Sequence, residues 1–178
     1  WHAKRSLGDF LKEAGVPGIT GIDTRALTKI LRTKGSMPGK IVVDGQDTNF
    51  YDPNNQNIIP EVSPKEPKFY KAGSKTIVMI DCGVKNNTIR HFLQRNISIY
   101  RVPWNYDFFE DDIRFDGVFI SNGPGDPALL SETVNLIKKC LERKIPTFGI
   151  CLGNQLMALA AGAKTYKLKY GHRAQNQP

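Results

Sequence analysis

The residues with the clearest chemical potential are Gly149-Ile150-Cys151-Leu152-Gly153, which match the pattern Gly-x-Cys-x-Gly. A short apolar run precedes them and an Ala-rich stretch follows, so we expect a sharp turn from a strand into a helix. Glycines two positions on either side of the cysteine permit that turn. The pattern has the form of a nucleophile elbow, with Cys151 where hydrolases of related layout carry serine.

This position would also make Cys151 reactive. The dipole at the start of a helix favours the thiolate, which is the nucleophilic form of cysteine. The N–H of Leu152, directly after the nucleophile, is placed to donate to an oxyanion. A buried structural cysteine is the alternative interpretation, and such cysteines are common. Cys82 and Cys140 lack glycines on both sides and are predicted to be packing residues.

A second candidate ligand-binding segment is the run Ser-Asn-Gly-Pro-Gly-Asp-Pro at residues 121–127. Gly123 and Gly125 flank a proline and predict a rigid turn. Backbone N–H groups of such a turn can approach a ligand without a Cβ in the way. Considered alone, the segment is equally compatible with an ordinary tight turn.

A cysteine nucleophile needs a base, usually a histidine that a carboxylate orients. None of the three histidines meets this need: His2 lies in the wrong segment, His91 falls on the surface of a predicted helix, and no Asp or Glu follows His172. We therefore expect the base beyond Pro178. The histidines and cysteines also lack metal-ligand spacing, so no metal is expected.

The elements that must position these segments begin at residue 75, where short β-branched runs alternate with helical periodicity. This alternation predicts an α/β fold with right-handed crossovers and a mostly parallel sheet covered on both faces. Ligands of such sheets bind beyond the carboxyl ends of the strands, where both candidate segments fall. The predicted strands are 76–80, 97–102, 117–121 and 147–150, and the predicted helices are 84–95, one capped by Ser131, and 153–161.

Two further helices are predicted near the start of the chain. Ser6 can cap the first, which would end at Gly15. Asp23 or Thr24 can cap the second, with Gly35 beyond its end.

The segment that follows these helices changes character. A short strand is expected over residues 40–43, closed by an Asp-Gly turn. Prolines at positions 60, 64 and 67 are expected to break any regular element. We therefore interpret residues 60–74 as an extended linker between two domains.

The charge balance excludes some classes of partner. The chain has 178 residues, with 25 Lys and Arg against 17 Asp and Glu, for a net charge of +8. This excess is spread along the chain, whereas a nucleic-acid-binding arm needs a dense basic stripe, usually with stacking aromatic residues. We interpret the excess positive charge as a surface that faces solvent or a subunit.

No apolar run approaches the roughly 18 residues of a membrane span. Neither nucleic acid nor a membrane is an expected partner.

Together, the elbow and the Gly-Pro-Gly turn resemble the class I, triad-type glutamine amidotransferases. Further motifs occur along the chain: Gly-Ile-Asp-Thr-Arg at 21–25, Leu-Thr-Lys at 27–29, Lys-Gly at 34–35, Asp-Cys-Gly-Val-Lys-Asn-Asn at 81–87, Gly-Ala-Lys-Thr-Tyr-Lys at 162–167 and Asn-Gln-Pro at 176–178. With these motifs, essentially the whole chain resembles the small subunit of carbamoyl-phosphate synthetase. Asp-Pro-Asn-Asn-Gln-Asn at 52–57 and Lys-Asn-Asn at 85–87 look most like the mitochondrial urea-cycle enzymes among its branches.

The resemblance implies a domain organisation. Residues 1–59 would be the C-terminal part of the small-subunit N-terminal α/β domain, and residues 60–74 the linker. Residues 75–178 would be a flavodoxin-like amidotransferase domain, truncated before its catalytic His and Glu. The His-Pro-Glu motif that carries this dyad is absent from the sequence, as is the N-terminal serine that helps hold glutamine. We expect this stretch alone to be inactive.

The resemblance also implies a reaction and roles for residues. The glutaminase unit of the family releases ammonia from glutamine and passes it to a large synthetase unit, in the same chain or in a separate subunit. That unit makes carbamoyl phosphate for arginine or pyrimidine synthesis from bicarbonate, ATP and ammonia. Cys151 would form a glutamyl thioester, Gly123 and Gly125 would line the glutamine site, the Leu152 N–H would hold the oxyanion, and Gln155 would contact glutamine. No cofactor is expected in this region, because ATP and Mg belong to the synthetase unit.

One departure from the family pattern leaves two hypotheses open. The glutamine-using pattern is Cys-Leu-Gly-His-Gln, and this sequence has Asn154 in place of the histidine. Asparagine keeps a hydrogen-bonding group but does not titrate near pH 7. Cys151 favours glutamine hydrolysis, whereas Asn154 favours a non-catalytic module of an ammonia-dependent synthetase. The urea-cycle-like motifs tip this balance slightly toward ammonia. A third interpretation, an unrelated flavodoxin-like binding module, leaves the joint occurrence of the elbow and the turn unexplained.

The compartment is predicted from the same two sources. An odd number of cysteines without a disulfide framework suggests a reducing compartment. The resemblance suggests the mitochondrial matrix, with the cytoplasm of the pyrimidine-pathway relative as the alternative.

Overall fold

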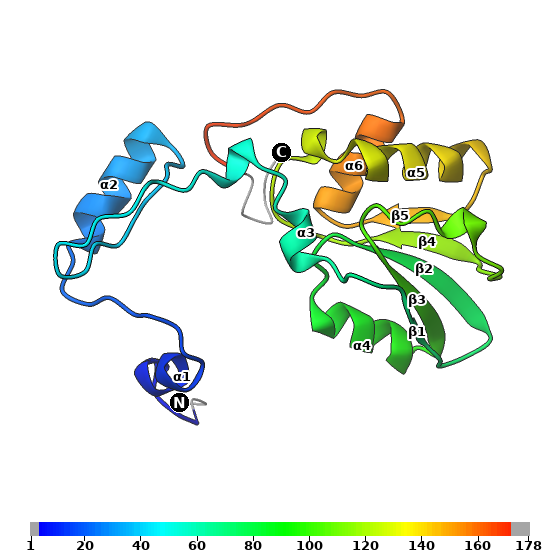
Figure 1. Cartoon of the computed structure of the whole chain (residues 1–178), viewed down its shortest axis with the longest axis horizontal. Coiled ribbons are helices and arrows are strands. Elements are labelled where there is room, and N and C mark those ends of the chain that lie inside the picture. Colours follow the sequence, from blue (N-terminus) through cyan, green and yellow to red (C-terminus); the bar gives the residue numbers. More distant parts are fainter. Residues whose placement is uncertain (1–3, 172–178) are drawn as a thin grey trace. The chain divides into compact units, whose positions relative to one another are not determined.

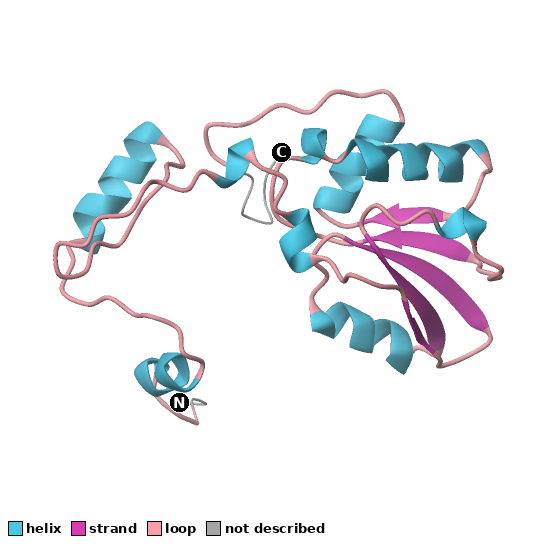
Figure 2. Ribbon diagram, viewed as in Figure 1, coloured by secondary structure: helices cyan, strands magenta, loops and turns pink. Residues whose placement is uncertain are grey.

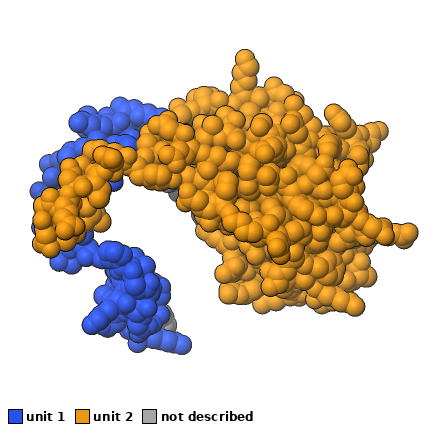
Figure 3. Space-filling model, viewed as in Figure 1, with its two compact units in different colours: residues 1–39, 168–178 blue, residues 40–167 orange. Residues whose placement is uncertain are grey.

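The computed structural model describes residues 4–171. The chain divides into two compact units, one of residues 1–39 with 168–178 and the other of residues 40–167 (Figure 3). All candidate site residues of the elbow and the Gly-Pro-Gly turn lie in the second unit.

The first unit contains both predicted N-terminal helices. Helix α1 spans Leu7–Glu13, and the Ser6 side chain caps it by accepting a hydrogen bond from the Asp9 N–H. Helix α2 spans Thr24–Lys34 and is capped in the same way by Asp23. Gly35 follows α2 with a φ of 86°, a conformation that favours glycine. Both helix predictions are confirmed, and Asp23 rather than its neighbour is the cap.

The strand predicted over residues 40–43 is wrong. The structure has only an isolated bridge between Val43 and Gln46. Asp44 and Gly45 form the expected turn, with φ of 51° and 74°. The turn therefore forms, but the segments on either side of it do not continue the pairing into a ladder.

The expectation that prolines exclude regular structure from residues 60–74 is also wrong. Helix α3 spans Ile59–Val62, and strand β1 spans Lys68–Tyr70. Pro60 lies in the first turn of α3, where a missing N–H costs nothing. Ile59, with only 1% of its surface exposed, is part of the main core of the second unit. The domain boundaries at 59/60 and 74/75 stay a prediction.

The second unit is built on a five-stranded sheet with the order β1-β3-β2-β4-β5 (Figures 1 and 2). Neighbouring strands are parallel except at the edge, where β1 is antiparallel to β3. The carboxyl ends of β2, β4 and β5 therefore meet at one end of the sheet. All four predicted strands and the mostly parallel sheet are confirmed; the strands span Lys75–Asp81 (β2), Ile97–Pro103 (β3), Gly117–Ile120 (β4) and Thr147–Gly149 (β5).

Helices cover both faces of this sheet. Helix α4, Asn86–Gln94, lies on one face, and α5, Ser131–Glu142, and α6, Leu152–Ala160, lie on the other (Figure 1). Ser131 is the first residue of α5 and makes no side-chain capping hydrogen bond, so its predicted role as a cap is wrong. Among the helices of residues 4–171, none combines the length and the apolar character needed to cross a membrane.

Side chains of the central strands alternate between two cores, as the period of a strand requires. Val78 and Ile80 of β2 pack with α5 and α6 in the larger core, and Met79 packs with α4 in the smaller one. These two cores hold the sheet between its helices.

Short 3₁₀ helices lie at Pro53–Asn55, Phe108–Glu110 and Pro127–Leu129.

Candidate active site

The predicted elbow is present at the end of β5. The strand ends at Gly149 and α6 begins at Leu152, with Cys151 between them. The backbone of Cys151 has a φ of 52° and a ψ of −107°. Residues other than glycine rarely have a positive φ, and such outliers gather at active sites. Cys151 is exposed, so its thiol is open to a reagent in solution.

The two glycines of the elbow are needed for close packing. A Cβ on Gly149 would lie 2.4 Å from the Gly153 carbonyl carbon and 2.7 Å from the Asn154 nitrogen. A Cβ on Gly153 would lie 2.4 Å from the carbonyl oxygen of Ile120, the last residue of β4. No side chain therefore fits at either position unless the backbone moves.

The Gly-Pro-Gly turn lies directly beside the elbow. A Cβ on Gly123 would lie 2.1 Å from the Cys82 carbonyl oxygen and 2.8 Å from Leu152 Cδ2. Gly125 has room around it but has a φ of 88°, which favours glycine for conformational reasons. The structure thus brings together the two segments that the sequence singled out.

The start of α6 supplies the other candidate groups. Leu152 is the first helical residue, so its N–H has no acceptor within the helix. Its side chain is 1% exposed and anchors the helix start in the core. Asn154 and Gln155 are both exposed, and the Gln155 N–H donates to the Cys151 carbonyl at 3.1 Å. The roles of Gly123, Leu152 and Gln155 toward glutamine stay a prediction.

No candidate base stands beside Cys151 in residues 4–171. His91, the one histidine in that range, lies exposed on α4. Its ring nitrogens are 3.1 Å from Asn87 Nδ2 and 3.2 Å from Arg95 Nη1 on the same helix. His2 and His172 fall outside the described residues. In the described part of the chain, no group of three His, Cys, Asp or Glu side chains could hold a metal ion.

The other two cysteines differ from Cys151 in their surroundings. Cys82 and Cys140 are 0% exposed and belong to the larger core. Burial raises the pKa of the Cys82 thiol to about 12 and that of Cys140 to about 11. Both therefore remain neutral thiols at physiological pH, which confirms the prediction that they are packing residues.

The structure also has a cavity of about 770 Å³, which Cys151 does not line. It opens over the α4 side of the sheet, and its lining includes Phe92, Phe119, Phe148 and Ile150 but not Cys151. Its walls are mostly apolar and contain no cysteine, and the polar side chains among them include Lys75, His91 and Asp116. We therefore place the candidate chemistry at the elbow rather than in this cavity.

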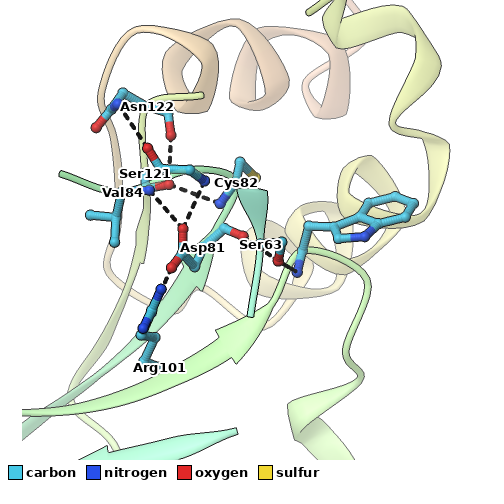
Figure 4. A network of polar contacts seen from close by, with 9 residues as sticks. Ser63, Asp81, Cys82, Val84, Arg101, Ser121 and Asn122 are labelled. Carbon is cyan, nitrogen blue, oxygen red and sulfur yellow. Dashed lines mark hydrogen bonds and ion pairs between the residues drawn. The ribbon is translucent and has the colours of Figure 1, made fainter. Parts of the chain in front are cut away.

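The structure also shows a polar network that sequence reasoning missed (Figure 4). Asp81, at the end of β2, is buried and paired with Arg101 of β3. Ser121 and Asn122 connect the same region to the Gly-Pro-Gly turn. An acidic residue at the end of a predicted strand, with a glycine two positions later, was the available signal. The pairing with Arg101 depends on strand register, which the sequence does not show.

Comparison with protein families gives two matches along the chain. Residues 78–178 match the model "Glutamine amidotransferase class-I", and residues 1–41 match "Carbamoyl-phosphate synthase small chain, CPSase domain". The first match covers more than half of the chain and includes the elbow and the Gly-Pro-Gly turn.

Several curated relatives match the whole chain. "Multifunctional protein CAD" of Squalus acanthias is 51% identical over 184 residues, covering 100% of this chain and 8% of its own length. The human mitochondrial carbamoyl-phosphate synthase (ammonia) is 51% identical over 181 residues, covering 100% of this chain and 12% of its own length. "Multifunctional protein pyr1-3" of Dictyostelium discoideum is 44% identical over 196 residues, with 100% and 9% covered. The chain thus spans about a tenth of the length of these relatives.

The family match includes the Cys151 elbow, and the relatives extend the similarity to the first residues of the chain. The chain therefore belongs to the class-I glutamine amidotransferase family, within the small-chain region of carbamoyl-phosphate synthases.

Proposed function

We propose that the protein hydrolyses glutamine at Cys151 and supplies the ammonia to a synthetase unit that makes carbamoyl phosphate. The observation that carries this proposal is the positive φ of Cys151 between β5 and α6. A cysteine that only packs has no need of this strained position, whereas a nucleophile gains an exposed position beside the free N–H of Leu152.

The chemistry follows from the groups at the elbow. The thiolate sulfur of Cys151 attacks the carboxamide carbon of glutamine, and a C–S bond forms. The Leu152 N–H stabilises the negative charge on the oxygen. The C–N bond then breaks, and the nitrogen leaves as ammonia after it gains a proton from a general acid. Water hydrolyses the glutamyl thioester to glutamate and regenerates the thiol.

Asn154 favours a second candidate function, in which this region is a non-catalytic module and free ammonia is the substrate. Its exposed side chain stands three residues after Cys151 and offers an amide where the glutamine-using pattern has histidine. A module of this kind would support the synthetase by docking alone. Relatives at 51% identity include a carbamoyl-phosphate synthase (ammonia), so the module hypothesis is tested alongside the first.

Glutamine hydrolysis at this site requires a partner that uses the ammonia. The partner is the large synthetase unit, in the same chain or a separate subunit, which binds ATP and Mg and receives the ammonia. Of the two compartments predicted, the mitochondrial matrix agrees with the human relative, and the cytoplasm is the alternative.

A covalent intermediate tests the proposal directly. The full-length protein is mixed with glutamine, quenched in acid within one turnover, and digested for mass spectrometry. We expect the peptide with Cys151 to carry one added glutamyl group, and the Cys151→Ala variant to carry none. Absence of the adduct in the unmodified protein, together with intact ammonia-dependent activity, would support the non-catalytic module instead.

A further inference from the structure

Asp81 is a fully buried carboxylate, 0% exposed, at the carboxyl end of β2. We propose that Asp81, through its ion pair with Arg101, is a positioning residue that holds the Gly-Pro-Gly turn against the Cys151 elbow. The proposal rests on the proposed function, because that function gives the turn its role in the glutamine site.

The carboxylate organises the loop that follows β2. Asp81 Oδ1 accepts the N–H groups of Gly83 and Val84, each at 2.7 Å, and so closes a tight turn. The other oxygen, Oδ2, accepts from Arg101 Nε at 2.5 Å (Figure 4). Both oxygens therefore have strong partners, as an ionised carboxylate without solvent contact requires.

The loop held in this way is the surface on which the Gly-Pro-Gly turn rests. The Cys82 N–H donates to Ser121 Oγ at 2.9 Å, and Ser121 Oγ donates to the Asn122 carbonyl at 2.7 Å. Asn122 Nδ2 donates to the Gly83 carbonyl at 3.1 Å. A Cβ on Gly83 would lie 3.2 Å from Pro124 Cδ, so loop and turn are also in van der Waals contact.

Gly123 completes the connection to the elbow. A Cβ at this position would meet both the Cys82 carbonyl oxygen and the Leu152 side chain, so Gly123 packs closely against both. A shift of the loop after β2 therefore displaces Gly123 toward or away from Leu152. Because the proposed function places Gly123 in the lining of the glutamine site, such a displacement weakens glutamine binding more than it slows the attack by Cys151.

A purely structural role accounts poorly for this ion pair. Buried ion pairs contribute little net stability compared with well-packed apolar side chains of similar volume. Such a pair does supply directional hydrogen bonds. The donors to the Asp81 carboxylate are Arg101 and two N–H groups of the loop that contacts the turn. The carbonyl of Asp81 also accepts from Ser63 Oγ at 2.7 Å, which fixes the same point from the α3 side.

Asp81→Asn is the sharpest test. The asparagine oxygen can still accept from the loop N–H groups, but its NH₂ would face Arg101, donor against donor. In the full-length protein we expect the KM for glutamine to rise about tenfold, with kcat changed by less than about threefold. The rate with free ammonia should not change. A fall in glutamine-dependent and ammonia-dependent rates together would overturn the proposal in favour of general destabilisation.

Amide hydrogen exchange tests the same inference without turnover. We expect residues 121–126 to exchange about tenfold faster in Asp81→Asn and in Arg101→Met, with α5 unchanged. Unchanged exchange in the turn, or equally faster exchange in α5, would overturn the positioning role. Lys75→Met is the matched control, because it breaks an exposed ion pair with Asp116 at the other end of β2.

The two proposals fail in different ways. If the unmodified protein shows no glutamine-dependent activity, the proposed function fails, and the exchange measurements alone then decide the role of Asp81. If glutamine is hydrolysed and exchange in the turn is the same in Asp81→Asn, only the positioning proposal fails.

Discussion

Cys151→Ser lowers glutamine-dependent formation of carbamoyl phosphate by at least about a thousandfold, and this is the largest effect that we expect from any single substitution. Serine keeps the size and shape of the side chain at the elbow. Its hydroxyl is far less acidic than a thiol, so the nucleophile is lost while the fold remains. The measurement compares initial rates with glutamine and with free ammonia in the full-length protein.

The ammonia-dependent rate of Cys151→Ser should equal that of the unmodified protein, because ammonia bypasses the elbow. Cys140→Ala serves as a control for loss of a thiol elsewhere. Cys140 is buried in α5 and has no part in the chemistry, so its replacement should keep the glutamine rate. A Cys151→Ser variant that retains glutamine activity would contradict the assignment of the nucleophile.

Gly149→Ala is expected to lower both stability and glutamine activity, and its effect is the second largest that we expect. A methyl group there would lie 2.4 to 2.7 Å from three backbone atoms of Gly153 and Asn154, closer than a real Cβ approaches. Backbone atoms cannot rotate away as the end of a side chain does, so α6 must move relative to β5. Overpacking of this kind costs about 3 kcal/mol in the free energy of unfolding. Displacement of Cys151 lowers glutamine activity by about a hundredfold.

Chemical denaturation and glutamine kinetics check this result together. Gly39→Ala is the control, because a Cβ at Gly39 has no neighbour within 4 Å and its backbone has no positive φ. We expect that variant to unfold like the unmodified protein. If Gly149→Ala were equally stable and equally active, the tight packing of the elbow would not position Cys151.

The central sheet could be predicted from the sequence because its strands are short β-branched runs between helices of regular period. The sequence did not predict α3 and β1, because each lies beside a proline that was expected to exclude regular structure. Pro60 is compatible with the first turn of α3, and β1 is an edge strand of three residues just after Pro67. On an edge, a missing N–H near the strand breaks no interior ladder. Proline spacing alone therefore did not distinguish these elements from a linker.

The elbow could be predicted because its chemistry is local: two glycines and a cysteine within five consecutive residues. The Asp81–Arg101 pair could not, because it depends on the register of two parallel strands. Met79 is opposite Arg101 in the β2–β3 pair, which brings the guanidinium within reach of Asp81 at the strand end. A sequence shows neither that register nor the side of the sheet on which α4 lies.

An isotope competition tests whether the nitrogen of carbamoyl phosphate is released from glutamine at Cys151. The full-length protein is given glutamine labelled with ¹⁵N in its amide, together with unlabelled ammonia at a concentration below the KM for ammonia. We expect the carbamoyl phosphate to carry the label. Product that carries only unlabelled nitrogen would contradict it and would identify this region as the non-catalytic module of an ammonia-dependent synthetase.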